Sequence, residues 1–214
     1  MTYKSFKFEE HTEYIQHQID RHIETQNRTA GRPHHLYISK IKTIFPEAKK
    51  ILCVGARHVS EVEAFTNNGF EALGIDLFSS NLEIIRLLDM HNIPEAFEEN
   101  EFDLIFSCHS LEHSLYPDRV FRGFRKCAKI GAFIVLPFQL EPNSKDPTVF
   151  SFMEAGGCKS KVDNPGEGIT KEIVQKDFNE LLENNIECRV KDLVICPLRP
   201  NKDDGYWISV NWNK

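Results

Sequence analysis

The sequence predicts an α/β protein: a doubly wound, mostly parallel seven-stranded sheet with N-terminal helices and a C-terminal antiparallel strand pair. From Lys50 onward, short apolar runs alternate with helix-like segments, which is typical of βαβ units. These runs are rich in apolar residues, as expected for strands covered on both faces. The last two runs are joined only by RPNKDDG, which is too short for a parallel crossover, so we expect them to pair as antiparallel neighbours.

The N-terminal part of the chain has the periodicity of amphipathic helices. A narrow stripe runs through EEHTEYIQHQIDRHIETQNR, and its members are Tyr14, Ile15, Gln18, Ile19, His22 and Ile23. After a Gly-Arg-Pro break, a second periodic segment carries Leu36, Ile38, Ile41 and Ile44 and ends at Phe45-Pro46. We therefore expect an N-terminal helical cap in residues 1–47 and a domain in residues 48–214, together forming one compact unit.

Seven apolar runs after this cap are predicted to be strands. They are KILCVG, FEALGIDL, EIIRLLDM, FDLIFSC, GAFIVLP, ECRVKDLVICPL and GYWISVNW. Helices are predicted in VSEVEAFTNNG, DRVFRGFRKCAK and ITKEIVQKDFNELLENN. Residues 139–168 contain several Gly and Pro and show no clear period, and such a long connection is either a substrate loop or lid, or else disordered.

Composition excludes several classes of protein. With 214 residues, 41% of them hydrophobic and 27% charged, the chain has the composition of an ordinary globular protein. No apolar run approaches the roughly 20 residues of a membrane span. The start, MTYKSFKFEEHTEY, lacks the apolar core of a signal peptide, so we expect a cytoplasmic protein with no membrane partner.

Cysteine spacing and net charge argue against two further features, a disulfide framework and a surface for long nucleic acid. The six cysteines are scattered singly, without a C-x-x-C pair, and are expected to be reduced, buried thiols: Cys53, Cys108, Cys127, Cys158, Cys188 and Cys196. A net charge of −6 and a pI of about 5.9 give no basic face for long nucleic acid. The oligomeric state is left open by the sequence.

The chemistry-bearing residues are expected at the ends of the strands. A ligand in an open parallel sheet lies outside the carboxyl ends of the strands, where the strand order reverses. The first strand ends at Gly55, the second at Asp76 and the third at Asp89, and SCHSLEH follows the fourth. Asp76, about twenty residues beyond the glycine turn, is placed to accept both ribose hydroxyls of an adenosine, and Asp89 to accept from the adenine amino group.

The segments ILCVG, LGIDL, LLDMHNIP and FDLIFSCHSLEH, with the final strand pair, resemble the class I S-adenosylmethionine-dependent methyltransferases, and their small-molecule branch in particular. The resemblance covers roughly residues 48–212 and implies a Rossmann-like fold, S-adenosyl-L-methionine as cofactor and a small-molecule acceptor. It also implies a place for each site residue: Gly55, Ala56 and Arg57 at the methionine part, Asp76 and Leu77 at the ribose, Asp89 and Met90 at the adenine, and Cys108 and His109 at the sulfonium. His109 is the best-placed general base, although it could equally be a satisfied or solvent-facing histidine.

The turn after the first strand departs from that family pattern. Arg57 and Val59 stand where further glycines are usual, and a missing glycine matters wherever the backbone needs a positive φ or a close approach to the ligand. Arg57 offers a guanidinium that can pair with the methionine carboxylate. The alternatives are that Arg57 is a solvated surface residue, or that cofactor binding has been lost and the chain is an inactive binding or interaction module.

Other interpretations of the same residues stay open. Asp76 could be a turn acid or helix N-cap before SSN, and Asp89 could cap the short helix near Pro94. HSLEH satisfies the H-x-x-E-H zinc pattern through His109, Glu112 and His113, but that pattern needs a sustained helix. We expect no metal site. The turn Gly-Ala-Arg-His-Val-Ser cannot supply the G-x-G-x-x-G of an NAD-dependent oxidoreductase.

Further sequence signals concern the acceptor. No N/D-P-P-Y/F sequence follows the fourth strand, which disfavours methylation of exocyclic base amines or glutamine amides. RTAGRPHH could cover an acceptor pocket with Arg28, Arg32, His34 and His35, or these could be ordinary polar residues at helix ends. Neither signal identifies the acceptor atom.

Overall fold

A computed structural model of the chain describes residues 11–25, 34–79, 81–114, 116–136, 190–199 and 202–212. Several predictions fall outside the described residues: the loop or lid in 139–168, the helix in ITKEIVQKDFNELLENN, the cysteines Cys158 and Cys188, and the arginines Arg28 and Arg32.

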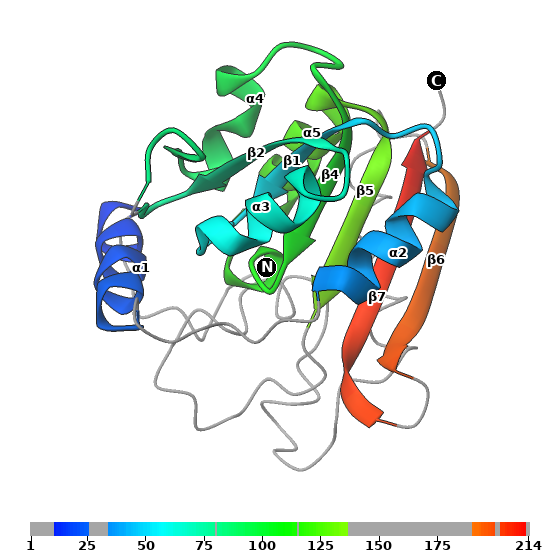
Figure 1. Cartoon of the computed structure of the whole chain (residues 1–214). Coiled ribbons are helices and arrows are strands. Elements are labelled where there is room, and N and C mark those ends of the chain that lie inside the picture. The colour runs from blue at the N-terminus through cyan, green and yellow to red at the C-terminus, as the bar shows by residue number, and fades with distance from the viewer. Residues whose placement is uncertain are drawn as a thin grey trace, which may run out of the picture.

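Helices and strands alternate through the described chain, as Figure 1 shows. The helices are α1 (His11–Thr25), α2 (His34–Ile44), α3 (Val59–Thr66), α4 (Ile93–Ala96) and α5 (Pro117–Cys127), with 3-10 turns η1 (Met90–Asn92) and η2 (Leu111–His113). The strands are β1 (Lys50–Val54), β2 (Glu71–Asp76), β3 (Ile85–Leu87), β4 (Phe102–Cys108), β5 (Ala128–Leu136), β6 (Val190–Arg199) and β7 (Lys202–Trp212).

The seven strands form one sheet in the order β3-β2-β1-β4-β5-β7-β6. Strands β1 to β5 pair in parallel, whereas β7 is antiparallel to both β5 and β6. This architecture confirms the predicted fold class, including the C-terminal antiparallel pair. The strand order reverses between β1 and β4, so the carboxyl ends of these two strands mark the switch point at which open α/β sheets bind ligands.

Each face of the sheet is covered by a separate apolar core. On one face, α5 buries Phe121 and Phe124 against the alternate side chains of β1, β4 and β5. On the other, α2 and α3 cover the sheet in Figure 1 and bury Tyr37, Ile41 and Phe65. Burial on both faces explains why the central strands β1, β4 and β5 are mostly apolar rather than alternating.

The buried face of α2 differs from the predicted stripe at Leu36, and Ile44 is half-buried. Leu36 was expected in the stripe but is 39% exposed, while Tyr37 is 1% exposed and lies with its ring centroid 5.9 Å from that of Phe106. Tyr37, Ile38, Ile41 and Phe45 follow the spacing of one helix face, and Leu36 falls outside it. The aromatic ring of Tyr37 therefore does the packing that the sequence pattern assigned to a leucine.

Two further features complete the fold. The third strand is short, since β3 covers Ile85–Leu87 within the predicted EIIRLLDM run. Within the described residues, no helix combines the length and apolar character needed to cross a membrane.

Candidate functional site

The turn after β1 is built around one glycine. Gly55 has a φ of 70°, and its N–H and that of Ala56 donate to the carbonyl oxygen of Ile75, at 2.9 and 3.1 Å. Among the described residues, the non-glycine positions with positive φ are Asn100 and His109, so neither Arg57 nor Val59 needs glycine's freedom. Val59 instead begins α3. The turn therefore forms without the family's further glycines.

Ser110 explains why position 55 must lack a side chain. A Cβ added to Gly55 would lie 2.3 Å from the Ser110 Cβ, much closer than real Cβ atoms approach one another. Ser110 Oγ donates to the carbonyl oxygen of Val54 at 2.8 Å and lies 2.8 Å from Ser107 Oγ, with both serines buried. These serines join β1 to β4 at the switch point. Sequence reasoning overlooked them, although two serines beside a buried strand end were a usable signal.

Asp76 is the last residue of β2, and it is only 4% exposed. Its Oδ1 accepts from the N–H of Phe78 at 3.1 Å, and its carbonyl oxygen accepts from the N–H of Leu88 at 2.9 Å. Asp76 therefore makes the hydrogen bond expected of a turn acid. A buried carboxylate at a strand tip is also the group that a ribose would require.

Asp89 caps η1 and holds the histidine inside it. Its Oδ1 accepts from the backbone N–H of His91 at 3.0 Å and lies 2.7 Å from His91 Nδ1. The capping alternative is thus correct in kind, but Asn92, not Asp89, is the N-cap of α4.

The end of β4 has an unusual backbone. Cys108 is the buried last residue of the strand, and His109 follows it with a φ of 54°, in the left-handed region. The His109 N–H donates to the carbonyl oxygen of Val135 at 2.9 Å, which fixes this conformation against β5. Non-glycine residues adopt such a φ rarely, and they cluster at functional sites when they do.

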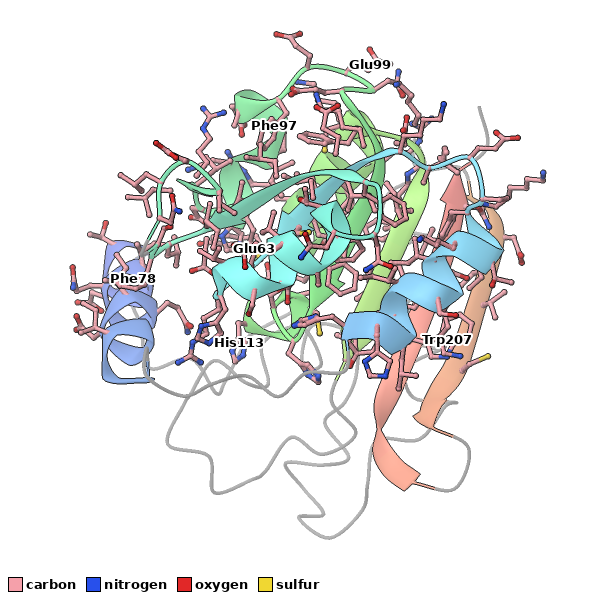
Figure 2. The ribbon with its side chains drawn as sticks, in the orientation of Figure 1. Glu63, Phe78, Phe97, Glu99, His113 and Trp207 are labelled. Atoms are coloured by element: carbon pink, nitrogen blue, oxygen red, sulfur yellow. The ribbon has the colours of Figure 1, made fainter. Side chains whose placement is uncertain are left out.

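The zinc pattern lacks the helix that it requires. His109 lies outside any helix, and η2 provides a single 3-10 turn from Leu111 to His113. The two histidines therefore do not occupy successive turns of one helix face. Figure 2 shows His113 at the side of the molecule toward which β4 runs.

Several predicted site residues lie along one edge of the sheet. Because β2, β1 and β4 are parallel neighbours, Asp76, the Gly55 turn and the Cys108-His109 pair follow one another at its carboxyl edge. Asp89 and Met90 come after β3, beyond β2. In the view of Figures 1 and 2, α1 and Phe78 lie on the side at which β2 ends.

The cysteine beneath this edge is not a nucleophile. Burial raises the pKa of Cys53 well above its usual value, and the nearby Glu61 carboxylate and Cys108 thiol raise it further. The thiol is therefore protonated at neutral pH, and the thiolate needed for attack is not formed.

The residues along the edge fit an adenosyl group. Two carboxylates at neighbouring strand tips can accept from ribose hydroxyls and from an exocyclic amine, and the guanidinium of Arg57 beside the turn can pair with a carboxylate. Among the described residues, no cluster of His, Cys, Asp and Glu suited to a metal ion is found. The donor set thus favours an organic ligand that carries hydroxyl, amino and carboxylate groups.

A segment of the chain matches a known protein family by sequence. Residues 52–136, which run from β1 to the end of β5 and contain every predicted site residue, match the family model described as a methyltransferase domain. A comparison with curated proteins gives no match.

Solved methyltransferase structures share the fold. An S-adenosylmethionine-dependent methyltransferase structure from Methanococcus maripaludis is 19% identical, with a TM-score of 0.55, and covers 94% of each chain. The 1,6-didemethyltoxoflavin-N1-methyltransferase of Burkholderia thailandensis, bound to S-adenosylhomocysteine, is 13% identical, with a TM-score of 0.59, over 95% of this chain and 87% of that one. An S-adenosylmethionine-dependent methyltransferase from Archaeoglobus fulgidus is 12% identical, with a TM-score of 0.52, over 88% and 97%. Residues 52–136 therefore resemble a methyltransferase domain by sequence, and the whole chain has the Rossmann-like methyltransferase fold.

Proposed function

We propose that this protein transfers the methyl group of S-adenosyl-L-methionine to a small-molecule acceptor. The observation that carries the proposal is the row of Asp76, the Gly55 turn and His109 along the carboxyl edge, at the switch point between β1 and β4. This row lies within the segment that matches a methyltransferase domain. Methyltransferases of the same fold bind S-adenosylhomocysteine, which supports the cofactor.

Each residue of the edge has a proposed binding role. Asp76 accepts from the ribose hydroxyls, with Leu77 beside it, and Asp89 accepts from the adenine amino group, with Met90 as apolar neighbour. The Gly55-Ala56 turn faces the methionine part of the cofactor, where Arg57 pairs with the carboxylate. Cys108 lies at the sulfonium side.

The proposed catalytic role belongs to His109. S-adenosylmethionine supplies, when bound, a methyl group on a positively charged sulfur. The chain's task is then to hold the acceptor in line with that methyl group, because positioning supplies most of the rate when the leaving group is already activated. His109 removes the proton of the acceptor. The hydrogen bond from its N–H to Val135 and its left-handed φ hold the backbone from which the imidazole projects.

The inactive-module alternative rested on one feature of the turn after β1. Its motive was the shortage of glycines after β1, yet the turn needs glycine at position 55 and is regular at Arg57 and Val59. Residues 1–47 remain a proposed cap; α1 lies on the side at which β2 ends, whereas α2 packs on a face of the sheet. A cytoplasmic location stays a prediction from the sequence.

Ligand-dependent stability tests the cofactor. S-adenosylhomocysteine at 100 times its Kd should raise the free energy of unfolding by about 2.7 kcal/mol, whereas NAD at the same concentration should leave it unchanged. Thermal unfolding of the full chain measures both. Stabilisation by NAD alone, or by neither ligand, would overturn the proposed function.

The acceptor class needs a separate measurement. We expect methyl-labelled S-adenosylmethionine, incubated with the protein and a mixed cell extract, to label the low-molecular-weight fraction after size separation. Label that enters only the macromolecular fraction would contradict the small-molecule assignment while leaving the cofactor intact. His109→Gln should lower the transfer rate by about 100-fold and leave the Kd for S-adenosylhomocysteine unchanged, because general-base catalysis contributes roughly that factor.

A further inference from the structure

A buried histidine joins two loops at the edge of the site. His91 is 2% exposed and lies in η1, directly after the loop that carries Asp89. On one side of its ring, Nδ1 lies 2.7 Å from Asp89 Oδ1. On the other, Nε2 lies 2.9 Å from the Oγ of Ser114, which is fully buried and belongs to the segment after β4. The ring therefore bridges the loops that follow β3 and β4.

The hydrogen bonds fix which nitrogen carries the proton. The backbone N–H of Tyr116 is shared between Ser114 Oγ at 3.2 Å and His91 Nε2 at 3.3 Å, and a backbone amide can only donate. Nε2 is therefore an acceptor, and it also accepts from the hydroxyl of Ser114. The proton of the neutral imidazole then sits on Nδ1 and is donated to Asp89 Oδ1. The side chain of Asp89 is thus oriented by a donor that is itself oriented from the far loop.

The backbone of η1 is held from the same direction. Arg119, on α5, donates from its Nε to the carbonyl oxygen of His91 at 2.6 Å and also pairs with Glu95 at 2.9 Å. The ring of Tyr116 meets the imidazole edge to face, with the centroids 5.6 Å apart. The contact of Arg119 holds the backbone of η1, and the ring of Tyr116 packs against the imidazole itself.

Asp89, His91 and Ser114 are hydrogen-bonded in the order of a catalytic Asp-His-Ser triad, but here the serine is inaccessible. Ser114 is fully buried, and the hydroxyl shares Nε2 with the Tyr116 amide, so no substrate carbonyl can reach it. A triad serine must be accessible to its substrate. The arrangement is therefore suited to holding Asp89 rather than to attack.

We propose that His91 is a positioning residue: it holds the carboxylate of Asp89 in the orientation that accepts from the adenine amino group, and it links that contact to the loop after β4. The inference rests on the proposed function, because Asp89 is the proposed adenine acceptor. His91 and Ser114 would then contribute to adenine recognition through Asp89, without contacting the adenine themselves.

The test compares S-adenosylhomocysteine with S-inosylhomocysteine, in which an oxygen replaces the adenine amino group. We expect the unmodified full chain to bind the first about tenfold more tightly by calorimetry, since an amine bonded to a carboxylate is worth roughly that factor. His91→Phe keeps the ring volume but loses both nitrogens, and this preference should fall to about twofold or less. His91→Asn places an amide N–H near the position of Nδ1 and should keep most of the preference.

The preference ratio separates positioning from stability. Asp103→Asn removes the charge of an aspartate at the opposite, amino end of the sheet and should leave the ratio at tenfold even if the protein unfolds more easily. If folded His91→Phe keeps the full preference, or if His91→Asn loses as much as His91→Phe, the inference is wrong. Failure of the unmodified chain to bind S-adenosylhomocysteine would instead reject the proposed function itself.

A second variant covers the case in which His91→Phe does not fold. Ser114→Ala removes only the hydroxyl at Nε2 and should lower the preference by about threefold. An unchanged ratio in that variant would overturn the link to the loop after β4. Covalent labelling of Ser114 by a fluorophosphonate, which reacts with activated and accessible serines, would also overturn the positioning role.

Discussion

Two aspartates at opposite ends of the sheet show different uses of the same side chain. Asp103, at the amino end of β4, accepts from the N–H groups of Lys49 and Lys50 at 2.8 and 2.9 Å and from the ammonium of Lys129 at 3.2 Å. These donors come from the start of β1 and from β5, so Asp103 ties three strands together. Asp76, at the carboxyl end of β2, accepts from the N–H of Phe78 two residues later, a bond that shapes the loop.

The difference separates an acid that stabilises the fold from one suited to a ligand. Burial alone would raise the pKa of Asp103, but the amides of Lys50 and Lys49 and the ammonium of Lys129 together hold it below its usual value. Its charge is therefore already compensated by the protein. Asp76 is nearly buried at a strand tip where the fold places ligands, so we expect its charge to be used in binding.

The largest expected effect comes from the glycines at the two ends. Gly55→Ala must place a Cβ 2.3 Å from that of Ser110 at a positive φ, and we expect it to lower the free energy of unfolding by about 3 kcal/mol. Gly69, in the loop before β2, has a φ of 89° and nothing within 4 Å of an added Cβ, so Gly69→Ala should cost about 1 kcal/mol. Urea denaturation measures both.

The pair Gly55→Ala and Ser110→Gly gives the control for this prediction. Removing the Ser110 side chain relieves the steric contact, so Gly55→Ala should cost less in the Ser110→Gly background than in the unmodified chain. Equal costs for Gly55→Ala and Gly69→Ala would show that Ser110 is not the obstacle.

The next largest effect contrasts the two aspartates, one expected to act on ligand binding and the other on stability. Asp76→Ala should weaken S-adenosylhomocysteine binding by about 100-fold, because two charge-assisted hydrogen bonds to the ribose are lost. Asp103→Ala should instead lower the free energy of unfolding by about 2 kcal/mol and leave the Kd unchanged. Calorimetry and denaturation of both variants test the comparison. A Kd of Asp76→Ala equal to that of the unmodified chain would reject its ribose assignment.

A smaller effect distinguishes the two ends of the proposed ligand. Arg57→Met should weaken S-adenosylhomocysteine by about tenfold and leave 5′-methylthioadenosine, which lacks the carboxylate, unaffected. The ratio of the two Kd values is the measurement. If both ligands weaken equally, Arg57 acts on the turn and not on the carboxylate.

The smallest expected effect is the pH dependence of Asp103. Because its pKa is lower in the folded than in the unfolded chain, its stabilisation is present above the unfolded pKa and is lost as the pH falls through the folded one. The stability of the unmodified chain should thus exceed that of Asp103→Asn by up to about 1 kcal/mol near pH 6, and the gap should close toward pH 2. A constant gap across acid titrations would contradict this.

Strand ends were predictable because each apolar run stops visibly, and a parallel sheet brings those ends to one edge. That rule placed Gly55, Asp76 and His109 correctly relative to the sheet. The contacts of Ser110 with Gly55 and of Ser114 with His91 were not predictable, since they join segments 55 and 23 residues apart, a separation that no local period records. The burial of Tyr37 was missed because the predicted stripe followed the aliphatic residues Leu36, Ile38, Ile41 and Ile44, whereas the buried face includes the ring of Tyr37.

The single-glycine turn has a consequence for engineering. Introducing glycine at positions 57 and 59 to imitate the usual pattern would relieve no strain, because the backbone there already takes ordinary negative φ values. Each such change would only widen the range of unfolded conformations and weaken the start of α3, by about 0.5–1 kcal/mol. For this chain, a sequence closer to the family consensus would make a less stable molecule.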